Sequence, residues 1–370
     1  MTPLLIECCR AHPDPGEIRR LAAQCADWAG FRDAASRHRV APLAFWSLNR
    51  ACPDAVPSGV LGGLRAEFGK ETRRNLIFTG ELLRILECFQ QSGIPAVSFK
   101  GPALAWSMYP EPGLRCMSDL DVLAPEGDVG RAIDLLNSNG YRLKPEMDLR
   151  FFMALGAVTL ERTDGGMELD LHWRLGPGYF NPLDAASCWR RLTTVDIAGS
   201  EARALCPEDS LALLCLHGAK HGWPALAGIC DVDRLIDTTP LDWDTILSDA
   251  HRRRMSLILS LGLCLARDLL GTRLPAQVWS RVQADARARE LAAEVRARLR
   301  QDSPRGRFYE IGFQFQVTEG IRGRLRFLGY LLHPNEGDWE TLRLPAWLFP
   351  CYYLLRPVRL AWKWGVRRGA

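Results

Sequence analysis

The stretch FKGPALAWSMYPEPGLRCMSDLDVL, residues 99–123, carries the strongest signal in this chain for both fold and chemistry. Near its end two aspartates, Asp119 and Asp121, are separated by a single residue. Side chains alternate between the two faces of a β-strand, so both carboxylates share one face. Leu120 and Val122 take the other face. The pattern predicts a strand that is half core and half polar site.

A second acidic strand is predicted about fifty residues later, in MELDLHW, residues 167–173. Here Glu168, Asp170 and His172 alternate with apolar residues, which places the three polar side chains on one face. The stretch is the second arm of an expected hairpin. Two half-polar strands in one compact unit are much rarer than an isolated pair of aspartates.

Clustered carboxylates repel one another and are costly to desolvate, so they need a counter-charge. A divalent cation supplies it, and Mg²⁺ commonly bridges one or two carboxylates to substrate phosphates. We expect Asp119 and Asp121 to bind such a cation. Asp170 is preferred over Glu168 as the third carboxylate, because Glu168 lies toward the start of its strand. The alternative is that the aspartates lie on a solvated sheet face.

The segment around these strands, residues 93–205, is predicted to form a small mixed α/β sheet. Its expected elements are a strand at 96–99, a helix at 103–108 opened by Pro102, a loop at 109–113, the strand at 118–122, a helix at 126–139 closed by Gly140, a strand from 141, and a hairpin of 158–162 with 167–173. Asp164-Gly165-Gly166 is a strong turn signal for that hairpin.

Helical spacing of apolar residues dominates on both sides of this core. Before it we expect helices, a loop at 53–63 and a long helix at 64–92, stopped by Gly93 and Pro95. After Pro207 the pattern is helical from 209 to 299. The predicted fold class is therefore α+β, with an N-terminal helical region (1–92), an α/β core (93–205) and a C-terminal helical domain with an aromatic and basic tail (206–370).

Composition narrows the function classes. The chain has 370 residues, 47% of them hydrophobic, which is enough for a sizeable core, and a formal net charge of only +4. That mild charge argues against binding of a long nucleic acid, although it does not exclude tRNA. The twelve cysteines include no CxxC pair, and neither a signal peptide nor an apolar run of about 18 residues is present. A cytoplasmic location is expected.

The motifs KGPALA, YPEPGLR and SDLDVL, followed by LDLHW and LHGAKHGW, resemble those of the bacterial uncharacterised nucleotidyltransferase family, within the polymerase-β-like superfamily. The resemblance covers about residues 30–355. The core pattern is also similar to that of nucleotidyltransferase toxins of toxin–antitoxin systems. The resemblance implies a nucleotidyltransferase core that takes an NTP, such as ATP, as co-substrate.

The same resemblance implies roles for individual residues. Asp119, Asp121 and Asp170 would hold Mg²⁺ (or Mn²⁺), and Asp170 would orient or deprotonate the acceptor hydroxyl. Lys100 and Gly101 occupy the place of the superfamily's phosphate-binding turn, at a helix N-terminus that favours anions. Lys-Gly-Pro departs from the commoner Gly-Ser or Gly-Gly.

Two neighbouring residues complete the expected nucleotide site. Arg115 either contacts the triphosphate or forms a salt bridge with the acidic cluster. Ser118 either binds a phosphate or caps the strand.

His217 and His221 are four residues apart and share a helix face, with Lys220 beside them. A substrate-facing helix is the favoured interpretation, and packing against the sheet is the plainer one. Zinc binding with Asp231 is a third, but no HExxH motif supports it. His172 is expected in the active site because it adjoins Asp170.

The tail at 345–368 mixes aromatic residues with arginines, a composition that suits a membrane interface. Pro350 and Pro357 are expected to break any single long helix there. Packing of its first half on the body is the default expectation, and peripheral membrane contact is the alternative.

Together these patterns predict a Mg²⁺-dependent transfer of a nucleoside monophosphate to a hydroxyl or phosphate acceptor on RNA, protein, peptide or sugar. Two alternatives stay open. One is a non-catalytic scaffold or partner in a biosynthetic or toxin–antitoxin-like system, against which the intact acidic triad speaks. The other is transfer of the γ-phosphate. The oligomeric state is not predicted.

Overall fold

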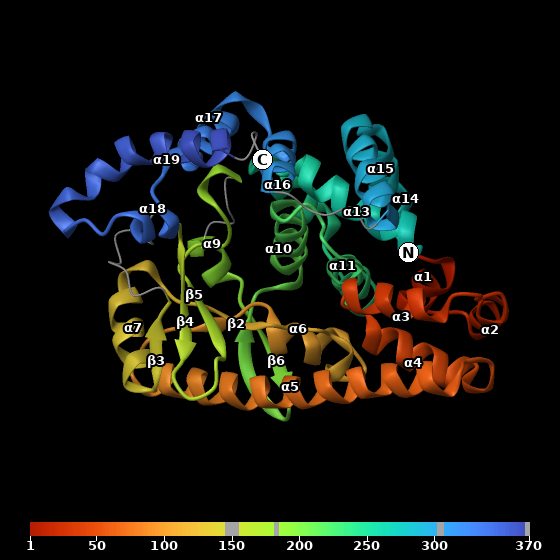
Figure 1. The fold of residues 1–370 in the computed structure, drawn as a ribbon. Coiled ribbons are helices and arrows are strands. Elements are labelled where there is room, and N and C mark those ends of the chain that lie inside the picture. The colour runs from red at the N-terminus through yellow and green to blue at the C-terminus, as the bar shows by residue number, and fades with distance from the viewer. Residues whose placement is uncertain (145–154, 181–184, 302–306, 367–370) are drawn as a thin grey trace.

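The computed structural model describes residues 1–144, 155–180, 185–301 and 307–366. It combines one seven-stranded mixed sheet with helices before and after it (Figure 1). In this view the sheet stands on the long helix α5, and the helices of the C-terminal half lie above and beside it. The predicted α+β class is confirmed.

Helices form the chain up to the first strand. They are α1 (Pro3–Cys9), α2 (Pro15–Ala23), α3 (Trp28–Arg37), α4 (Ala41–Ala51), the 3₁₀ turn η1 (Pro53–Ala55) and α5 (Ser58–Gln91). The predicted loop at 53–63 is too long, because α5 already begins at Ser58. Three glycines in its first turns each cost about 1 kcal/mol relative to alanine. Packing against α4, with Leu64 fully buried, offsets that cost.

The strands are β1 (Val97–Ser98), β2 (Asp119–Leu123), β3 (Tyr141–Leu143), β4 (Ala157–Arg162), β5 (Glu168–His172), β6 (Thr193–Ile197) and β7 (Ser200–Ala204). Their order across the sheet is β3-β4-β5-β2-β1-β7-β6. β4 and β5 form the predicted antiparallel hairpin. β2 runs parallel to β5, and this pairing brings the two acidic strands side by side.

The antiparallel hairpin β6–β7 has no counterpart in the sequence prediction. Its residues, TTVDI and SEARA, carry few large apolar side chains, so a half-buried strand pattern is weak. The turn between them is built by Ala198 and Gly199, both with positive φ (55° and 81°). Because alanine occupies the first turn position, this turn lacks the usual Asn-Gly or Gly-Gly signature and was not predicted.

Short helices connect the strands. They are α6 (Gly101–Met108), η2 (Pro112–Leu114), η3 (Glu126–Asp128), α7 (Val129–Ser138), η4 (Gly178–Phe180) and α9 (Ala185–Arg190). The two helices predicted at 103–108 and 126–139 are confirmed, with Gly140 at φ 83° just after the second.

From Pro207 onward the described chain is helical, and the helical pattern predicted for 209–299 is confirmed. Its elements are α10 (Pro207–Lys220), α11 (Leu226–Thr238), α12 (Trp243–Arg252), α13 (Ser256–Leu270), α14 (Ala276–Ala284), α15 (Ala286–Gln301), α16 (Arg307–Val317), α17 (Gly320–Leu332), α18 (Glu336–Thr341), η5 (Ala346–Cys351) and α19 (Tyr352–Val366). Pro350 lies in η5, whereas Pro357 lies inside α19 and does not end it. The missing N–H of Pro357 falls near the start of that helix, where the lost bond would go to the carbonyl of half-exposed Tyr353.

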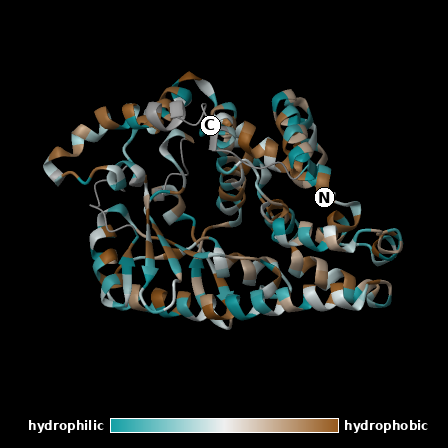
Figure 2. Ribbon diagram, in the orientation of Figure 1, coloured by the Kyte–Doolittle hydropathy of each residue, from teal (hydrophilic) through white to brown (hydrophobic). Residues whose placement is uncertain are grey.

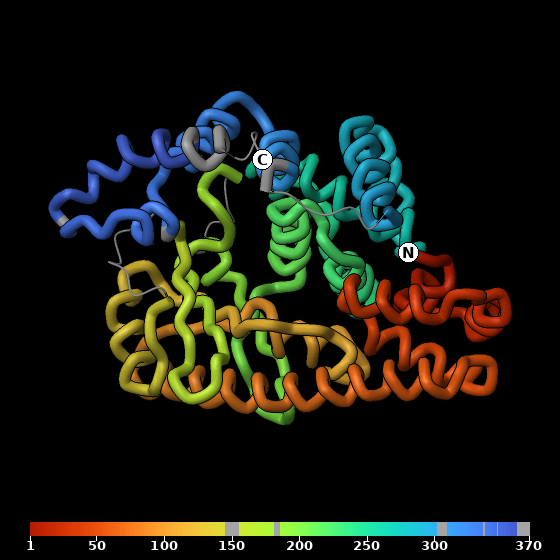
Figure 3. The backbone as a smooth tube through the Cα atoms, in the orientation of Figure 1, coloured from red at the N-terminus to blue at the C-terminus, as the bar shows by residue number. Residues whose placement is uncertain are grey.

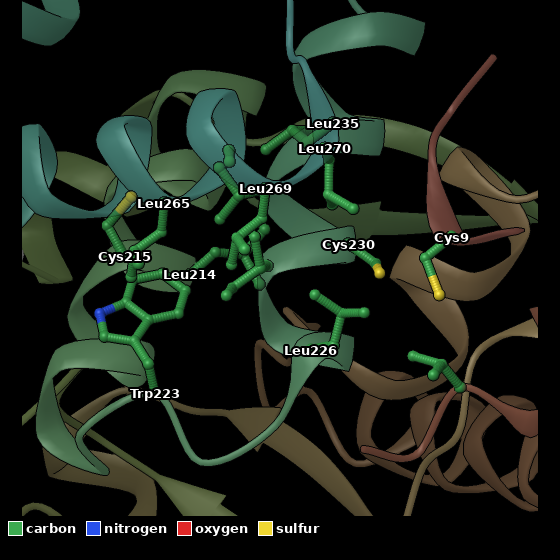
Figure 4. Close-up of a cluster of buried hydrophobic side chains, with 14 of the residues drawn as sticks. Cys9, Leu214, Cys215, Trp223, Leu226, Cys230, Leu235, Leu265, Leu269 and Leu270 are labelled. Carbon is green, nitrogen blue, oxygen red and sulfur yellow. The ribbon is translucent and has the colours of Figure 1, made fainter. Parts of the chain in front are cut away.

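Two clusters of buried apolar side chains support this arrangement. One lies under the sheet and includes the second half of α5, from Phe78 to Phe89. The other joins the N-terminal helices to the helices after residue 206. Figure 3 shows these segments, distant in sequence, lying side by side at one end of the molecule. In Figure 4, Cys9 of α1 faces Cys230 of α11 across this second cluster. The predicted boundaries at 92 and 205 stay a prediction.

Among the helices that the structure describes, none combines the length and the apolar character needed to cross a bilayer.

Candidate active site

The parallel pairing of β2 and β5 positions the acidic side chains. In the register of these strands Asp119 lies opposite Glu168, and Asp121 lies opposite Asp170. The intervening leucines and valine, including Leu120 and Leu169, are fully buried on the other face. The sheet therefore carries its carboxylates as adjacent pairs on one face, as the alternation predicts.

Three side chains converge closely enough to hold one metal ion. A carboxylate oxygen from each of Asp121 and Asp170 and a ring nitrogen of His172 all lie within 4.8 Å of one another. Among the residues that the structure describes, no other group of three His, Cys, Asp or Glu side chains brings its ligand atoms this close together. Thr159 of β4 donates a 2.6 Å hydrogen bond to Asp170 and fixes its carboxylate. The two carboxylate oxygens suit Mg²⁺ or Mn²⁺, whereas the imidazole nitrogen is a ligand that metals such as Zn²⁺ or Fe²⁺ prefer.

Asp119 lies beside this group. Burial raises the pKa of its carboxyl, and the negative charges of Asp121 and Asp170 raise it further. Those charges act on Asp119 only because the three carboxylates are close. Ser118 donates a 3.1 Å hydrogen bond to Asp119. A bound cation would relieve the repulsion among the three carboxylates.

Glu168, the less favoured candidate for the third carboxylate, has another partner. Its carboxylate lies 2.9 Å from the ammonium of Lys144, which also pairs with Glu161 at 3.2 Å. The side chains of Glu168 and Lys144 are 42% and 48% exposed, so this is a surface ion pair. Of the two acids on β5, Asp170 alone belongs to the convergent group.

Lys100, in the predicted phosphate turn, contacts the acidic cluster. Its ammonium lies 3.1 Å from Asp121. His172 Nε2 lies 3.2 Å from the same carboxylate. Burial alone would raise the pKa of Asp121, but Lys100 and His172 outweigh it and hold that pKa well below the usual range. Asp121 is 4% exposed and stays ionised because of these neighbours.

Gly101 follows Lys100 and begins α6. Its φ of 51° lies in the left-handed region that favours glycine, and its Cβ position would lie 3.5 Å from the backbone oxygen of Asp119. The turn therefore runs directly beside the first aspartate, and Pro102 continues it into the helix as expected.

Arg115 forms its salt bridge with Asp231 and not with the acidic cluster, and its contact with a triphosphate stays a prediction. Its guanidinium donates to both oxygens of Asp231 on α11, at 2.9–3.2 Å, and to the backbone oxygen of Gly101 at 3.3 Å. Tyr109 donates a 2.8 Å hydrogen bond to the same aspartate. This clamp (Tyr109, Arg115 and Asp231) ties the predicted phosphate turn to the C-terminal helices. Because Asp231 is occupied in this way, the zinc site with His217 and His221 has no support.

The last turn of α10 faces the acidic cluster. The rings of His217 and His221 lie 4.7 Å apart between centroids. The positive charge of Lys100 lowers the pKa of His217 well below its usual value, and burial adds to that effect. Burial lowers the pKa of His221 to about 4, with help from Lys220. Both imidazoles are therefore neutral at pH 7.

Lys220, between these histidines, is the second cation near the carboxylates. Burial lowers the pKa of its ammonium, as does the charge of Lys100, while Asp170 and Asp121 act in the opposite direction. Its backbone oxygen accepts a 2.7 Å hydrogen bond from Gln314 of α16. Gly218 permits this end of α10 to pack, because a Cβ there would lie 2.5 Å from the ring of Trp223. The predicted substrate-facing position of this helix end agrees with these neighbours.

Lysine is rare in this protein, and two of its lysines lie beside the carboxylates. The chain has 47 Lys and Arg residues, of which only five are lysines, and two of those five are Lys100 and Lys220. Arginine is the ordinary cation of this protein, so the presence of two of its five ammonium groups beside the carboxylates is notable. Lysine binds phosphate as a point charge and changes its pKa readily when it is buried.

Several positioning residues escaped the sequence prediction. Thr159 lies on the opposite arm of the hairpin, and alternation on β4 places it on the same face as Asp170. Asn75 of α5 donates to the backbone oxygens of Pro112 and Arg115, and so holds the loop that carries Arg115. No local motif marks Asn75 or Tyr109, since their partners are distant in sequence.

Comparison with known proteins agrees with this geometry. The model of a family described as "Uncharacterised nucleotidyltransferase" matches residues 24–271, which is more than half of the chain. The match includes both acidic strands and α10, but it ends well before residue 355, where the sequence resemblance was expected to end. No curated protein and no solved structure matches the chain.

Proposed function

The chain belongs to the uncharacterised nucleotidyltransferase family, and we propose that it transfers a nucleoside monophosphate from an NTP to a hydroxyl or phosphate acceptor. The family's enzymes are transferases of phosphorus-containing groups. The observation that carries the proposal is the convergence of Asp121 and Asp170 with His172, beside Asp119, on two parallel strands.

In this proposal Asp119, Asp121 and Asp170 hold Mg²⁺ or Mn²⁺, and His172 adds a nitrogen ligand. A bound divalent cation would activate the attacking oxygen and neutralise charge on the leaving pyrophosphate. Asp170 orients the acceptor hydroxyl or takes its proton, in a position fixed by the hydrogen bond from Thr159.

Lys100, Gly101 and Ser118 are proposed to bind the nucleotide's phosphates. The ammonium of Lys100 pairs with Asp121 at 3.1 Å, and we propose that it pairs with a phosphate instead once a cation compensates that aspartate. The pairing with Asp231 favours a positioning role for Arg115. We assign His217, Lys220 and His221 to the triphosphate or the acceptor, because they face the same carboxylates.

The acceptor is left open among a tRNA end, a protein side chain, a peptide and a sugar. A cytoplasmic location is part of the proposal. It rests on the twelve cysteines, all of which are free thiols and eight of which are buried.

Calorimetric titration of the full chain with each NTP, in the presence of Mg²⁺ or Mn²⁺, tests the proposal against a non-catalytic scaffold. We expect divalent-dependent binding of at least one NTP. Absence of any NTP affinity would contradict nucleotidyl transfer and favour the scaffold.

NTPs labelled at the α- or the γ-phosphate distinguish the two transfer reactions. Retention of the α-label on the acceptor, with release of the γ-label in pyrophosphate, is the expected result. Retention of the γ-label alone would identify a phosphotransferase instead.

A further inference from the structure

The C-terminal arm, residues 320–366 with α17, α18, η5 and α19, exposes an unusual amount of apolar surface. Fourteen large apolar side chains are exposed in the described part of the chain, and eleven belong to this arm. They are Ile321, Leu325, Leu328, Tyr330, Leu332, Leu342, Trp347, Tyr353, Leu354, Leu355 and Val358. Figures 1 and 2 show the arm projecting beyond the sheet, with hydrophobic and hydrophilic residues interspersed. Large exposed apolar patches mark interaction sites.

In α17 the apolar residues divide between two opposite faces. Gly323 and Phe327 face the body, where the Phe327 ring lies 4.8 Å from the ring of Tyr179. A stripe of Ile321, Leu325, Leu328 and Leu332, spaced at four, three and four residues, faces solvent. A helix needs one such face to pack on its own protein. The second face has no such use within the described chain.

The charge of this region is strongly positive. Residues 320–370 contain nine Lys and Arg against three Asp and Glu, although the whole chain has a net charge of only +4. Within the described residues no ion pair involves the exposed arginines 322, 324, 326 and 343. By contrast, the buried Asp338 pairs with both Arg356 and Arg359. The buried acid Asp338 is thus neutralised inside the arm, and basic charge exceeds acidic charge on the remaining residues.

The arm is held in shape before it meets a partner. Tyr352 is buried, donates to the backbone oxygen of Leu342 at 2.6 Å and accepts from the backbone N–H of Leu344 at 2.9 Å. Arg356 also donates to the backbone oxygen of Leu331 at the end of α17. These contacts fix α17, α18 and α19 to one another, so the exposed side chains belong to a preorganised surface.

We propose that the C-terminal arm binds the surface of a membrane that contains anionic phospholipids. Arginines flanking the stripe would pair with lipid phosphates, and the exposed leucines and Trp347 would enter the boundary between headgroups and acyl chains. The positive charge requires an anionic partner. The exposed apolar surface requires one that offers hydrocarbon as well.

Cosedimentation of the full chain with vesicles tests the proposal. We expect binding to mixed phosphatidylcholine–phosphatidylglycerol vesicles, weakened by salt, and little binding to phosphatidylcholine alone. The double substitution Ile321→Glu and Leu354→Glu should weaken the partition about tenfold, because both side chains are more than 70% exposed and would carry charge into the interface. Arg322→Gln with Arg326→Gln should reduce the preference for anionic vesicles.

The matched control is Leu76→Glu with Ile77→Glu, at two apolar residues of α5 that are 55% and 56% exposed. These substitutions should leave vesicle binding unchanged. Failure of the wild-type chain to bind anionic vesicles would overturn the proposal, as would equal loss in the arm and control variants. A wild-type dimer in light scattering that the arm substitutions convert to monomer, without vesicle binding, would show instead that the face joins two copies.

Discussion

Two nearly buried ion pairs, Arg115–Asp231 and Lys100–Asp121, differ in how completely their charges are compensated. The Arg115–Asp231 pair in the clamp is bidentate, and Asp231 also accepts a hydrogen bond from Tyr109. The Lys100–Asp121 pair is a single 3.1 Å contact amid two further carboxylates and an imidazole. Both pairs are nearly buried, with side-chain exposures of 12% and 9% in the first and 14% and 5% in the second.

The difference indicates what each pair is for. The Arg115 pair satisfies its own charges and holds two parts of the molecule together. The Lys100 pair leaves negative charge on Asp119 and Asp170 uncompensated, so a divalent cation can take over the role of the ammonium. One pair is structural, and the other is exchangeable.

Asp121→Asn should produce the largest effect on activity. Loss of this ligand is expected to lower the rate of nucleotidyl transfer about a thousandfold, equivalent to about 4 kcal/mol in the activation barrier. The thermal unfolding temperature should also fall, but by less than in Asp231→Asn, because Lys100 loses the counter-ion Asp121 while the charge of Asp119 remains near it. Steady-state kinetics with Glu168→Gln as the matched control checks the prediction. Comparable losses in both variants would contradict it.

Asp231→Asn should mainly lower the stability of the fold, with a smaller effect on the rate of nucleotidyl transfer. It leaves the guanidinium of Arg115 buried without its counter-ion, which is expected to cost about 3 kcal/mol in the free energy of unfolding. Asp237→Asn, on the same helix but in an exposed pair with His12, should cost less than about 1 kcal/mol. Urea titration measures both. If both substitutions lower the free energy of unfolding by less than about 1 kcal/mol, the clamp does not contribute appreciably to stability.

Addition of Mn²⁺ or Mg²⁺ should stabilise the wild-type chain. At about a hundred times the dissociation constant the gain is about 2.7 kcal/mol in the free energy of unfolding. Asp121→Asn should abolish this gain, whereas Asp237→Asn should preserve it. Thermal melts with and without the metal provide the measurement. Stabilisation of Asp121→Asn to the wild-type extent would place the ion elsewhere.

Lys100→Met should weaken phosphate binding and remove the counter-ion of Asp121, and the smallest change expected in this variant is a shift in one proton equilibrium. The charge of Lys100 is the main reason that the pKa of His217 is low. Its removal makes protonation of the imidazole less costly, so the pKa should rise and the ring should release its proton at a higher pH. Nitrogen-15 NMR titration of the histidines, assigned with His217→Gln, follows this change. The matched variant Lys70→Met, at an exposed lysine of α5, should leave the pKa of His217 unchanged.

The local features of the site could be predicted from the sequence. Alternation placed Asp119 with Asp121, and Asp170 with His172, while Asp164-Gly165-Gly166 indicated the hairpin. Glycine and proline marked the turn after Lys100. Each of these depends on residues close together in the chain, where backbone geometry leaves few alternatives.

Long-range features could not be predicted in the same way. The parallel register that sets Asp121 beside Asp170 depends on the β2–β5 pairing, which no local pattern encodes. From the sequence, Asp231 was considered only as a zinc ligand, because no residue near it in the chain indicates that it pairs with Arg115. Its partner lies 116 residues away, so only the packing of α11 on the core identifies the clamp.

The scarcity of lysine makes the proposed site chemically addressable. An acylating reagent used near neutral pH attacks the unprotonated amine, and the lowered pKa of Lys220 enlarges that fraction. Only five amines of this kind exist among 47 basic side chains, and one of the others, Lys144, is shared between two glutamates. The extent of modification of Lys220, read by peptide mass, would therefore report whether a ligand is bound beside it and the acidic strands.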